Sequence, residues 1–127
     1  MPFSALPAIG RSADVRGAEY VIVLIHLLCS IYGANEEMIT CMVEKESSFN
    51  VNAEYRGHLG LAQFLPSTYE WLAGIAAQDG SFYHGNVLVG GPWDATASLS
   101  LMIWAIQNGY AEHWSTYEMC HEGHLEK

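Results

Sequence analysis

Glu46 is the residue whose type and position point most directly to chemistry. It stands at the end of a predicted helix in which Ile39, Met42 and Val43 form an apolar stripe. Continuing that spacing places Glu46 on the same stripe, toward the packed side of the helix. Partial desolvation and the negative end of a helix dipole both disfavour an ionised carboxylate. The sequence therefore predicts a carboxyl group suited to general acid catalysis.

A structural role for Glu46 is the alternative. A glutamate in the last turn of a helix is usually an ordinary charged residue, paired here with Lys45 or Arg56. Glu44 lies about 200° round the helix from Glu46 and should face water. Only one of these two carboxylates is therefore singled out.

Glu46 also begins a pattern of residue types at characteristic spacing. The pattern reads Glu46-Ser47-x-Phe49, Ala53, Gly57, Gly60-Leu61-x-Gln63 and Pro66-x-Thr68. As a whole it resembles the soluble lytic transglycosylase family, which shares the lysozyme-like fold with goose-type lysozymes. The resemblance is strongest over residues 36 to 75, and the stretch Arg56-Gly57-His58-Leu59 looks most like phage and phage-derived members.

The resemblance implies a substrate and a reaction. Enzymes of this family cleave the β-1,4 bond between N-acetylmuramic acid and N-acetylglucosamine in peptidoglycan glycan strands. Their catalytic acid falls on Glu46, the serine after it on Ser47, and the glycine and glutamine of their second motif on Gly60 and Gln63. It further implies a single glutamate acid/base, 1,6-anhydromuramyl ends, and action in the bacterial cell envelope as a phage lysin or virion component.

Two other functions stay open. A lysozyme-type hydrolase of the same bond would need a second carboxylate to activate water, and Glu54, Glu70 and Asp94 are the candidates. An inactive glycan-binding virion protein would keep the fold without the activity. Many transglycosylases also carry an Ala-Tyr-Asn-Ala-Gly segment whose tyrosine approaches the acid. This chain lacks that segment, and its nearest candidates are Trp104 and Tyr110.

The residues of the second motif have physical roles of their own. Gly57 and Gly60 fit a tight loop passing close to the helix of Glu46, because glycine admits positive φ and leaves room for a sugar. Gln63 offers a donor and an acceptor, which suits a carboxyl or acetamido group, although a solvent-facing loop amide is the alternative. Tyr83 belongs to an irregular aromatic stretch, Gln78 to Pro92, which suits stacking against sugar rings or packing onto the domain.

Composition limits the possible partners. The chain has 127 residues, half of them hydrophobic, which suits one domain with one core. The formal net charge is −9 with five basic residues, so we expect no nucleic-acid partner. A monomer without a cofactor is expected. Histidines and a cysteine near the C-terminus lack the paired spacing of a metal site, and no metal is predicted: they are His113, Cys120, His121 and His124.

The expected elements make a mainly α fold (α+β), lysozyme-like, with a possible small β-hairpin within residues 50–66. Residues 1–17 contain Pro2, Pro7 and Gly10 and predict an irregular arm, leaving residues 18–127 as the lysozyme-like catalytic domain. The uncharged stretch Tyr20–Gly33 is too short for a comfortable membrane span and predicts a buried helix, with a signal or anchor segment as the alternative.

Helix boundaries follow from capping residues. Asn35 should cap the helix that delivers Glu46, and Asp94 should cap a long core helix through about Asn108. Ser67 and Glu70 fit a capping box that opens a helix carrying Trp71, Leu72 and Ile75 as scaffold. The acidic tail Cys120–Lys127 should be frayed.

Three cysteines leave an odd count: Cys29, Cys41 and Cys120. Members of the family with a comparable C-terminal segment carry one cysteine just before the catalytic glutamate and another at the C-terminus. The resemblance therefore implies a Cys41–Cys120 disulfide with Cys29 as a buried thiol. Three reduced cysteines in a cytoplasmic protein are the alternative.

Overall fold

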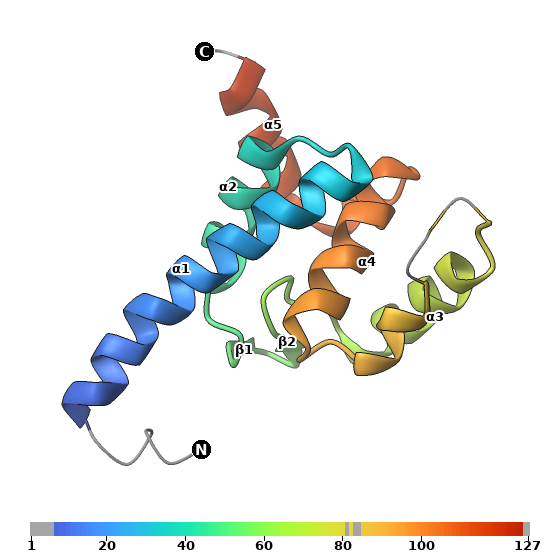
Figure 1. Ribbon diagram of the computed structural model, residues 1–127. Coiled ribbons are helices and arrows are strands. Elements are labelled where there is room, and N and C mark those ends of the chain that lie inside the picture. Colours follow the sequence, from blue (N-terminus) through green and yellow to red (C-terminus); the bar gives the residue numbers. More distant parts are fainter. Residues whose placement is uncertain (1–6, 81, 83–84, 126–127) are drawn as a thin grey trace.

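The protein is mainly helical (Figure 1). The computed structural model describes residues 7–80, 82 and 85–125. Over these residues the α-helices are α1 (Pro7–Tyr32), α2 (Glu36–Ser47), α3 (Pro66–Ala77), α4 (Ala95–Gln107) and α5 (Ser115–Leu125). Two short 3₁₀ helices, η2 (Gly85–Gly90) and η3 (Ala111–His113), accompany them, with a hairpin of β1 (Glu54–Tyr55) and β2 (His58–Leu59). The expected mainly α fold with a small hairpin is confirmed, and a lysozyme-like arrangement stays a prediction.

Helix α4 is the centre of the core. It packs against α1, α3 and η2, and every residue from Ala97 to Ala105 is buried. Its start is fixed by Asp94, whose side chain accepts a 2.8 Å hydrogen bond from the Ala97 amide. It ends before Gly109, which has φ of +95°. Both the cap and the core position of this helix are confirmed.

Helix α1 is longer than the sequence predicts. It begins at Pro7, so residues 7–17 are helical and the expected irregular arm is wrong for them. A proline at the first helical position has a suitable φ and lacks an amide that the helix could not use, which explains the start. Residues 1–6 lie outside the described residues.

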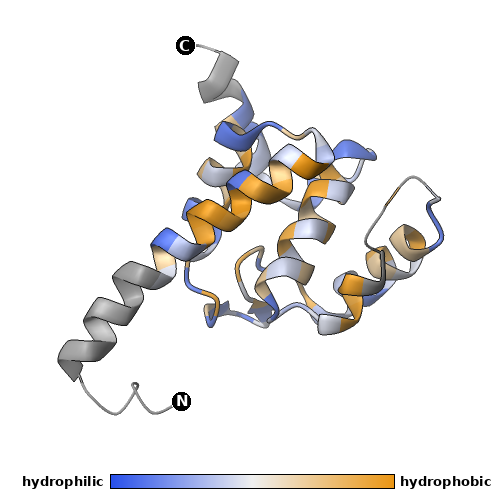
Figure 2. Ribbon diagram, viewed as in Figure 1, coloured by the Kyte–Doolittle hydropathy of each residue, from blue (hydrophilic) through white to orange (hydrophobic). Residues whose placement is uncertain are grey.

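One side of α1 packs on the core and the other does not. Val21, Ile25 and Leu28 are buried, whereas an apolar strip away from the core is exposed: Tyr20, Val23, Leu27 and Ile31. Ile22, on the flank of the helix, is exposed as well. Figure 2 shows the run of apolar residues along this part of α1. Over the described residues, no helix combines the length and apolarity needed to cross a bilayer. The monomeric state stays a prediction.

The helix that carries Glu46 is joined covalently to the last helix. Asn35 caps α2 by accepting a 3.1 Å hydrogen bond from the Met38 amide, as expected. A disulfide links Cys41 of α2 to Cys120 of α5, and Cys29 is a buried free cysteine, so the expected pairing is confirmed. The structure corrects the frayed tail, because α5 continues through Leu125.

The thiols give a direct chemical test. Burial, and secondarily the charge of Glu36, raises the pKa of Cys29 to about 11, so its reactive thiolate forms only in strongly alkaline solution. We expect no reaction of the native, unreduced protein with a thiol reagent at pH 8. After denaturation one thiol should react, and after reduction three. Counting three thiols in the denatured, unreduced protein would contradict the disulfide.

Helix α3 starts two residues earlier than a capping box at Ser67 requires, since Ser67 as the cap would make Thr68 the first helical residue. Its first residue is Pro66, and the cap residue Leu65 makes no side-chain hydrogen bond. The fixed φ of Pro66 starts the helix without side-chain capping, so the capping-box prediction is wrong. Leu72 is buried, but Trp71 is 51% exposed and does not belong to the core scaffold.

The stretch between α3 and α4 is partly ordered into η2, so it is not wholly irregular. Phe82 in this stretch is buried and contacts the rings of Tyr32 and Trp104. Phe82 therefore packs onto the domain, which is the second of the two expected roles. Tyr83 and His84 lie outside the described residues.

Candidate functional site

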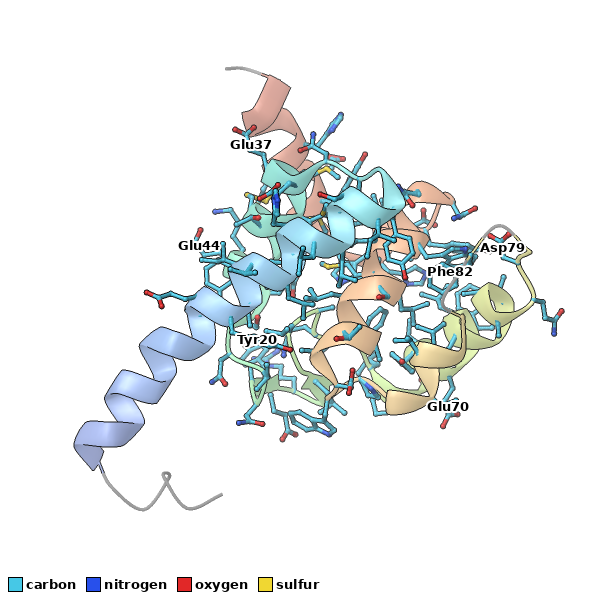
Figure 3. The ribbon with its side chains drawn as sticks, in the orientation of Figure 1. Tyr20, Glu37, Glu44, Glu70, Asp79 and Phe82 are labelled. Carbon is cyan, nitrogen blue, oxygen red and sulfur yellow. A yellow bond between two sulfur atoms is a disulfide. The ribbon has the colours of Figure 1, made fainter. Side chains whose placement is uncertain are left out.

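Glu46 lies in the last turn of α2 and is half-buried, whereas Glu44 is exposed and points away from the helix bundle (Figure 3). One carboxylate oxygen of Glu46 accepts a 2.7 Å hydrogen bond from the hydroxyl of Thr116 in α5. This contact comes from the helix that the disulfide fastens to α2. The carboxyl group is therefore oriented by a neighbouring element, not only by its own rotamer.

The second oxygen of Glu46 is left available. Among the described residues it accepts no hydrogen bond, and neither Lys45 nor Arg56 forms an ion pair with it. No described side-chain atom is both buried and without a hydrogen-bond partner, so this oxygen must be accessible to solvent. Among the described residues, Glu46 therefore does not form the ion pair with Lys45 or Arg56 that was the structural alternative.

The chain turns sharply directly after Glu46. Ser48 and Phe49 both have positive φ, 53° and 61°, in the left-handed region that non-glycine residues rarely adopt. Such residues cost of order 1–3 kcal/mol each and persist where packing fixes them. Here Phe49 packs against the core, and the turn directs the chain into the β1–β2 hairpin.

Ser47 is buried, and its hydroxyl donates a 3.1 Å hydrogen bond to the carbonyl of Val43. The hydroxyl is thus bound within its own helix. A contact between Ser47 and a sugar stays a prediction.

Position 60 requires glycine because another part of the chain lies very close to it. The neighbour is a backbone segment and not the expected sugar. Gly60 has φ of +76°, and a Cβ built on it would lie 2.3 Å from the carbonyl oxygen of Pro92. The space beside Gly60 is therefore filled by the chain that leads into α4. The expectation that this glycine leaves room for a sugar is corrected, whereas its positive φ agrees with the sequence.

Gln63 fastens the turn that follows β2, residues 60–63, with its side-chain amide. Its Nε2 donates to the carbonyls of Gly60 and Ala53, at 2.9 and 3.2 Å. Its Oε1 has no hydrogen-bond partner among the described residues and reaches solvent, by the same reasoning as for Glu46. Gln63 therefore offers a ligand an acceptor only, because its donor is already used by the loop.

A short segment before and within α5 connects the two motifs. Trp114 donates through Nε1 to the carbonyl of Ala62, beside Gln63, at 2.8 Å. Thr116, two residues further along, is the hydrogen-bond partner of Glu46. Glu46 and the residue next to Gln63 thus both bond to the segment of residues 114–116.

The other candidate carboxylates are more exposed than that of Glu46. Asp94 accepts the Ala97 amide as a helix cap, and Glu54 and Glu70 are exposed on β1 and α3. Among the side chains that the structure describes, no three histidine, cysteine or acidic groups lie together as a metal site would require.

A pocket lies elsewhere on the domain. It has a volume of about 540 Å³ and lies between α3, α4 and the start of η3. Its lining includes Trp71, Gly74, Asp79, Trp104 and Tyr110. None of Glu46, Ser47, Gly60 and Gln63 lines it. The structure therefore separates the predicted acid from this pocket.

Sequence reasoning missed the partner of the acid. Trp104 and Tyr110 were the nearest substitutes for the absent tyrosine, yet both line the pocket and it is Thr116 that bonds to Glu46. A polar residue close to Cys120 was the available signal, because a Cys41–Cys120 bond brings that segment beside α2.

Comparisons with known proteins add no further assignment. No protein-family model matches the chain, and neither the curated proteins nor the solved structures gave a match.

Proposed function

We propose that this protein is a peptidoglycan lytic transglycosylase with a lysozyme-like fold and Glu46 as its single acid and base. One observation carries the proposal: a half-buried carboxyl group is held at one oxygen by Thr116 and is open at the other. A general acid needs this combination, because it must be oriented and must also reach the atom it protonates. The residue pattern around Glu46 supplies the substrate class.

The reaction balances with this one residue. The protonated carboxyl group of Glu46 gives its proton to the oxygen between N-acetylmuramic acid and N-acetylglucosamine, and the bond from the muramyl C1 to that oxygen breaks. The acetamido group of the substrate stabilises C1 in place of a protein nucleophile. Glu46, now ionised, takes the proton of the muramyl C6 hydroxyl as that oxygen bonds to C1. The product carries a 1,6-anhydro ring, and no water is consumed.

The positions of the other carboxylates favour this route over hydrolysis. Asp94 uses one oxygen as a helix cap, and Asp94, Glu54 and Glu70 are all exposed, so none of them shares the half-buried setting of Glu46. A tethered hydroxyl on the substrate attacks with a high effective molarity, so it needs no dedicated water-activating base. We place this activity in the bacterial cell envelope, in a lysin or virion component of phage origin.

Product analysis tests the proposal. After digestion of purified peptidoglycan, we expect 1,6-anhydromuropeptides as the main products by mass spectrometry. Mostly reducing N-acetylmuramic acid ends would show a lysozyme-type hydrolase. In that case Glu54→Gln and Asp94→Asn, measured against the parent, would locate the base.

If the protein is instead an inactive glycan-binding protein, a cell-wall assay should give a different outcome. Such a protein would leave the turbidity of a cell-wall suspension unchanged while still sedimenting with the walls. A fall in turbidity that depends on Glu46 would exclude it.

A further inference from the structure

The pocket between α3, α4 and η3 is lined by aromatic rings, one of which is open to solvent. Trp71 is 51% exposed, whereas Trp104 is only 5% exposed and lies beneath Tyr110, with centroids 5.7 Å apart in a stacked arrangement. Trp71 meets Tyr110 edge-on at 5.6 Å and His113 at 5.8 Å. These contacts fix the orientation of the exposed indole, so Trp71 forms a rigid platform at the edge of the pocket.

Polar groups stand beside this platform and are themselves fixed. Asp79 accepts a 2.7 Å hydrogen bond from Nε1 of Trp104, and Asn108 donates through Nδ2 to the carbonyl of Trp104 at 2.8 Å. Asp79 lies two residues after the end of α3, on the same side of the molecule as Phe82 (Figure 3). Gln78 adds an exposed amide to the lining. An aromatic face next to carboxylate and amide groups suits a ligand with one apolar face and a rim of hydroxyl groups.

The charge of the lining disfavours anionic ligands. Asp79 is the charged residue among those that line the pocket, and no lysine or arginine is among them. The whole chain also carries a formal charge of −9, which repels anions at long range. The charge of the pocket therefore favours an uncharged or a cationic ligand.

The ring geometry disfavours a cationic ligand. An aromatic cage holds an ammonium group between rings that stand apart from one another. In this pocket the rings of Trp71, Tyr110 and Trp104 contact each other directly, with centroids 5.6 and 5.7 Å apart. These rings therefore form one continuous surface and not a cage, and the exposed face of Trp71 can stack against the apolar C–H face of a sugar ring.

We propose that this pocket binds an uncharged pyranose ring of an oligosaccharide, which stacks on Trp71 and hydrogen-bonds to Asp79 and Asn108. N-acetylglucosamine units fit this description, because they are uncharged and carry an acetamido group that the pocket amides can bind. The binding does not depend on catalysis by Glu46.

The pocket is connected to the region of Glu46 by a short stretch of chain. His113 contacts Trp71 on one side and Trp114 on the other, and Thr116 reaches Glu46. From Tyr110 to Thr116 the chain can span at most about 20 Å. The backbone at the edge of the pocket therefore lies within about 20 Å of the residue that bonds to Glu46.

Titration with N-acetylglucosamine tetramer, followed by NMR on the Glu46→Gln protein, tests the proposal without cleavage of the ligand. We expect the indole signals of Trp71 and Trp104 to shift on binding. Trp71→Ala should weaken the affinity by roughly tenfold, the scale of a lost aromatic contact, and Trp71→Phe should recover part of it. Tyr20→Ala is the control, because it removes a similarly exposed aromatic ring, 58% exposed, from the apolar strip of α1.

Gly74 allows a second variant that separates binding from folding. It lies in α3 and lines the pocket, and a Cβ built on it would meet nothing within 4 Å. Gly74→Met should fill part of the pocket and abolish binding, while its melting temperature should not fall, because methionine favours a helix more than glycine does. Loss of binding without loss of stability supports the pocket.

The outcomes separate this proposal from the proposed function. Weakened binding in Trp71→Ala and Gly74→Met supports the pocket even if the parent protein cleaves no peptidoglycan. Binding of glucose tetramer at the same residues shows that the hydroxyl rim is sufficient without the acetamido group. The proposal is overturned if the tetramer does not bind, if Trp71→Ala binds as tightly as its parent, or if choline competes for the pocket.

Discussion

Glu46→Gln is expected to fold normally and to lose at least about a hundredfold of the wall-degrading activity, the low end of the range for general acid catalysis. Glutamine keeps the shape of the side chain and can still accept the hydrogen bond from Thr116. It has no proton of suitable acidity to give to a leaving oxygen. The measurement is the initial rate of turbidity loss in a cell-wall suspension, with circular dichroism as the check on folding.

Two sets of controls make this result specific. Glu44→Gln removes the same charge from the same helix, but from an exposed side chain, so it should retain the parent rate. Thr116→Val keeps the shape of threonine but removes the hydroxyl that orients Glu46, and we expect a loss of roughly tenfold, the scale of one hydrogen bond. Thr116→Ser should restore most of that rate. Near-normal activity of purified Glu46→Gln would remove Glu46 from the mechanism.

The sequence predicts helix boundaries well where a side chain supplies the capping hydrogen bond. Asn35 and Asp94 act as expected, because an oxygen three residues before a free amide is a local feature that the sequence displays directly. Boundaries set by backbone geometry were harder to predict. Pro7 and Pro66 start helices by their fixed φ. In the sequence alone a proline is equally typical of an irregular segment, so these two helix starts were not predicted.

Contacts between distant residues limit the prediction of the site. Glu46 and Gln63 lie within one local pattern, so the sequence could indicate both. The hydrogen bond between Glu46 and Thr116 joins residues 70 positions apart, and no local spacing indicates it. Gly60 was assigned a positive φ correctly, yet the chain that fills the space beside it is the distant segment at Pro92.

The same separation explains why the pocket was not predicted. Its lining comes from α3, α4 and the start of η3, three segments whose relation depends on packing around the core. Trp71 occupies a helix position beside Leu72, and the apolar pattern alone treats both as scaffold. Only the packed arrangement shows that Leu72 is buried and Trp71 is half-exposed.

Gly60→Ala is expected to cause the largest loss of stability among the glycine substitutions considered. An added Cβ would lie 2.3 Å from the carbonyl oxygen of Pro92, which is backbone and cannot rotate away, and the residue has φ of +76°. Overpacking and left-handed strain together should lower the free energy of unfolding by roughly 2–5 kcal/mol. Urea denaturation followed by circular dichroism measures the change.

Two other glycines separate the causes of that loss. Gly109 has φ of +95° but open space around it, so Gly109→Ala should show only the strain of a left-handed residue, about 1–2 kcal/mol. Gly74 has neither a positive φ nor a neighbour within 4 Å, so Gly74→Ala should stabilise α3 by up to about 1 kcal/mol. If Gly60→Ala costs no more than Gly109→Ala, the close approach of Gly60 to Pro92 is wrong. The turn after β2 that contains Gln63 would then be free to lie elsewhere, and the assignment of the Gln63 side-chain oxygen to the site would have to be abandoned.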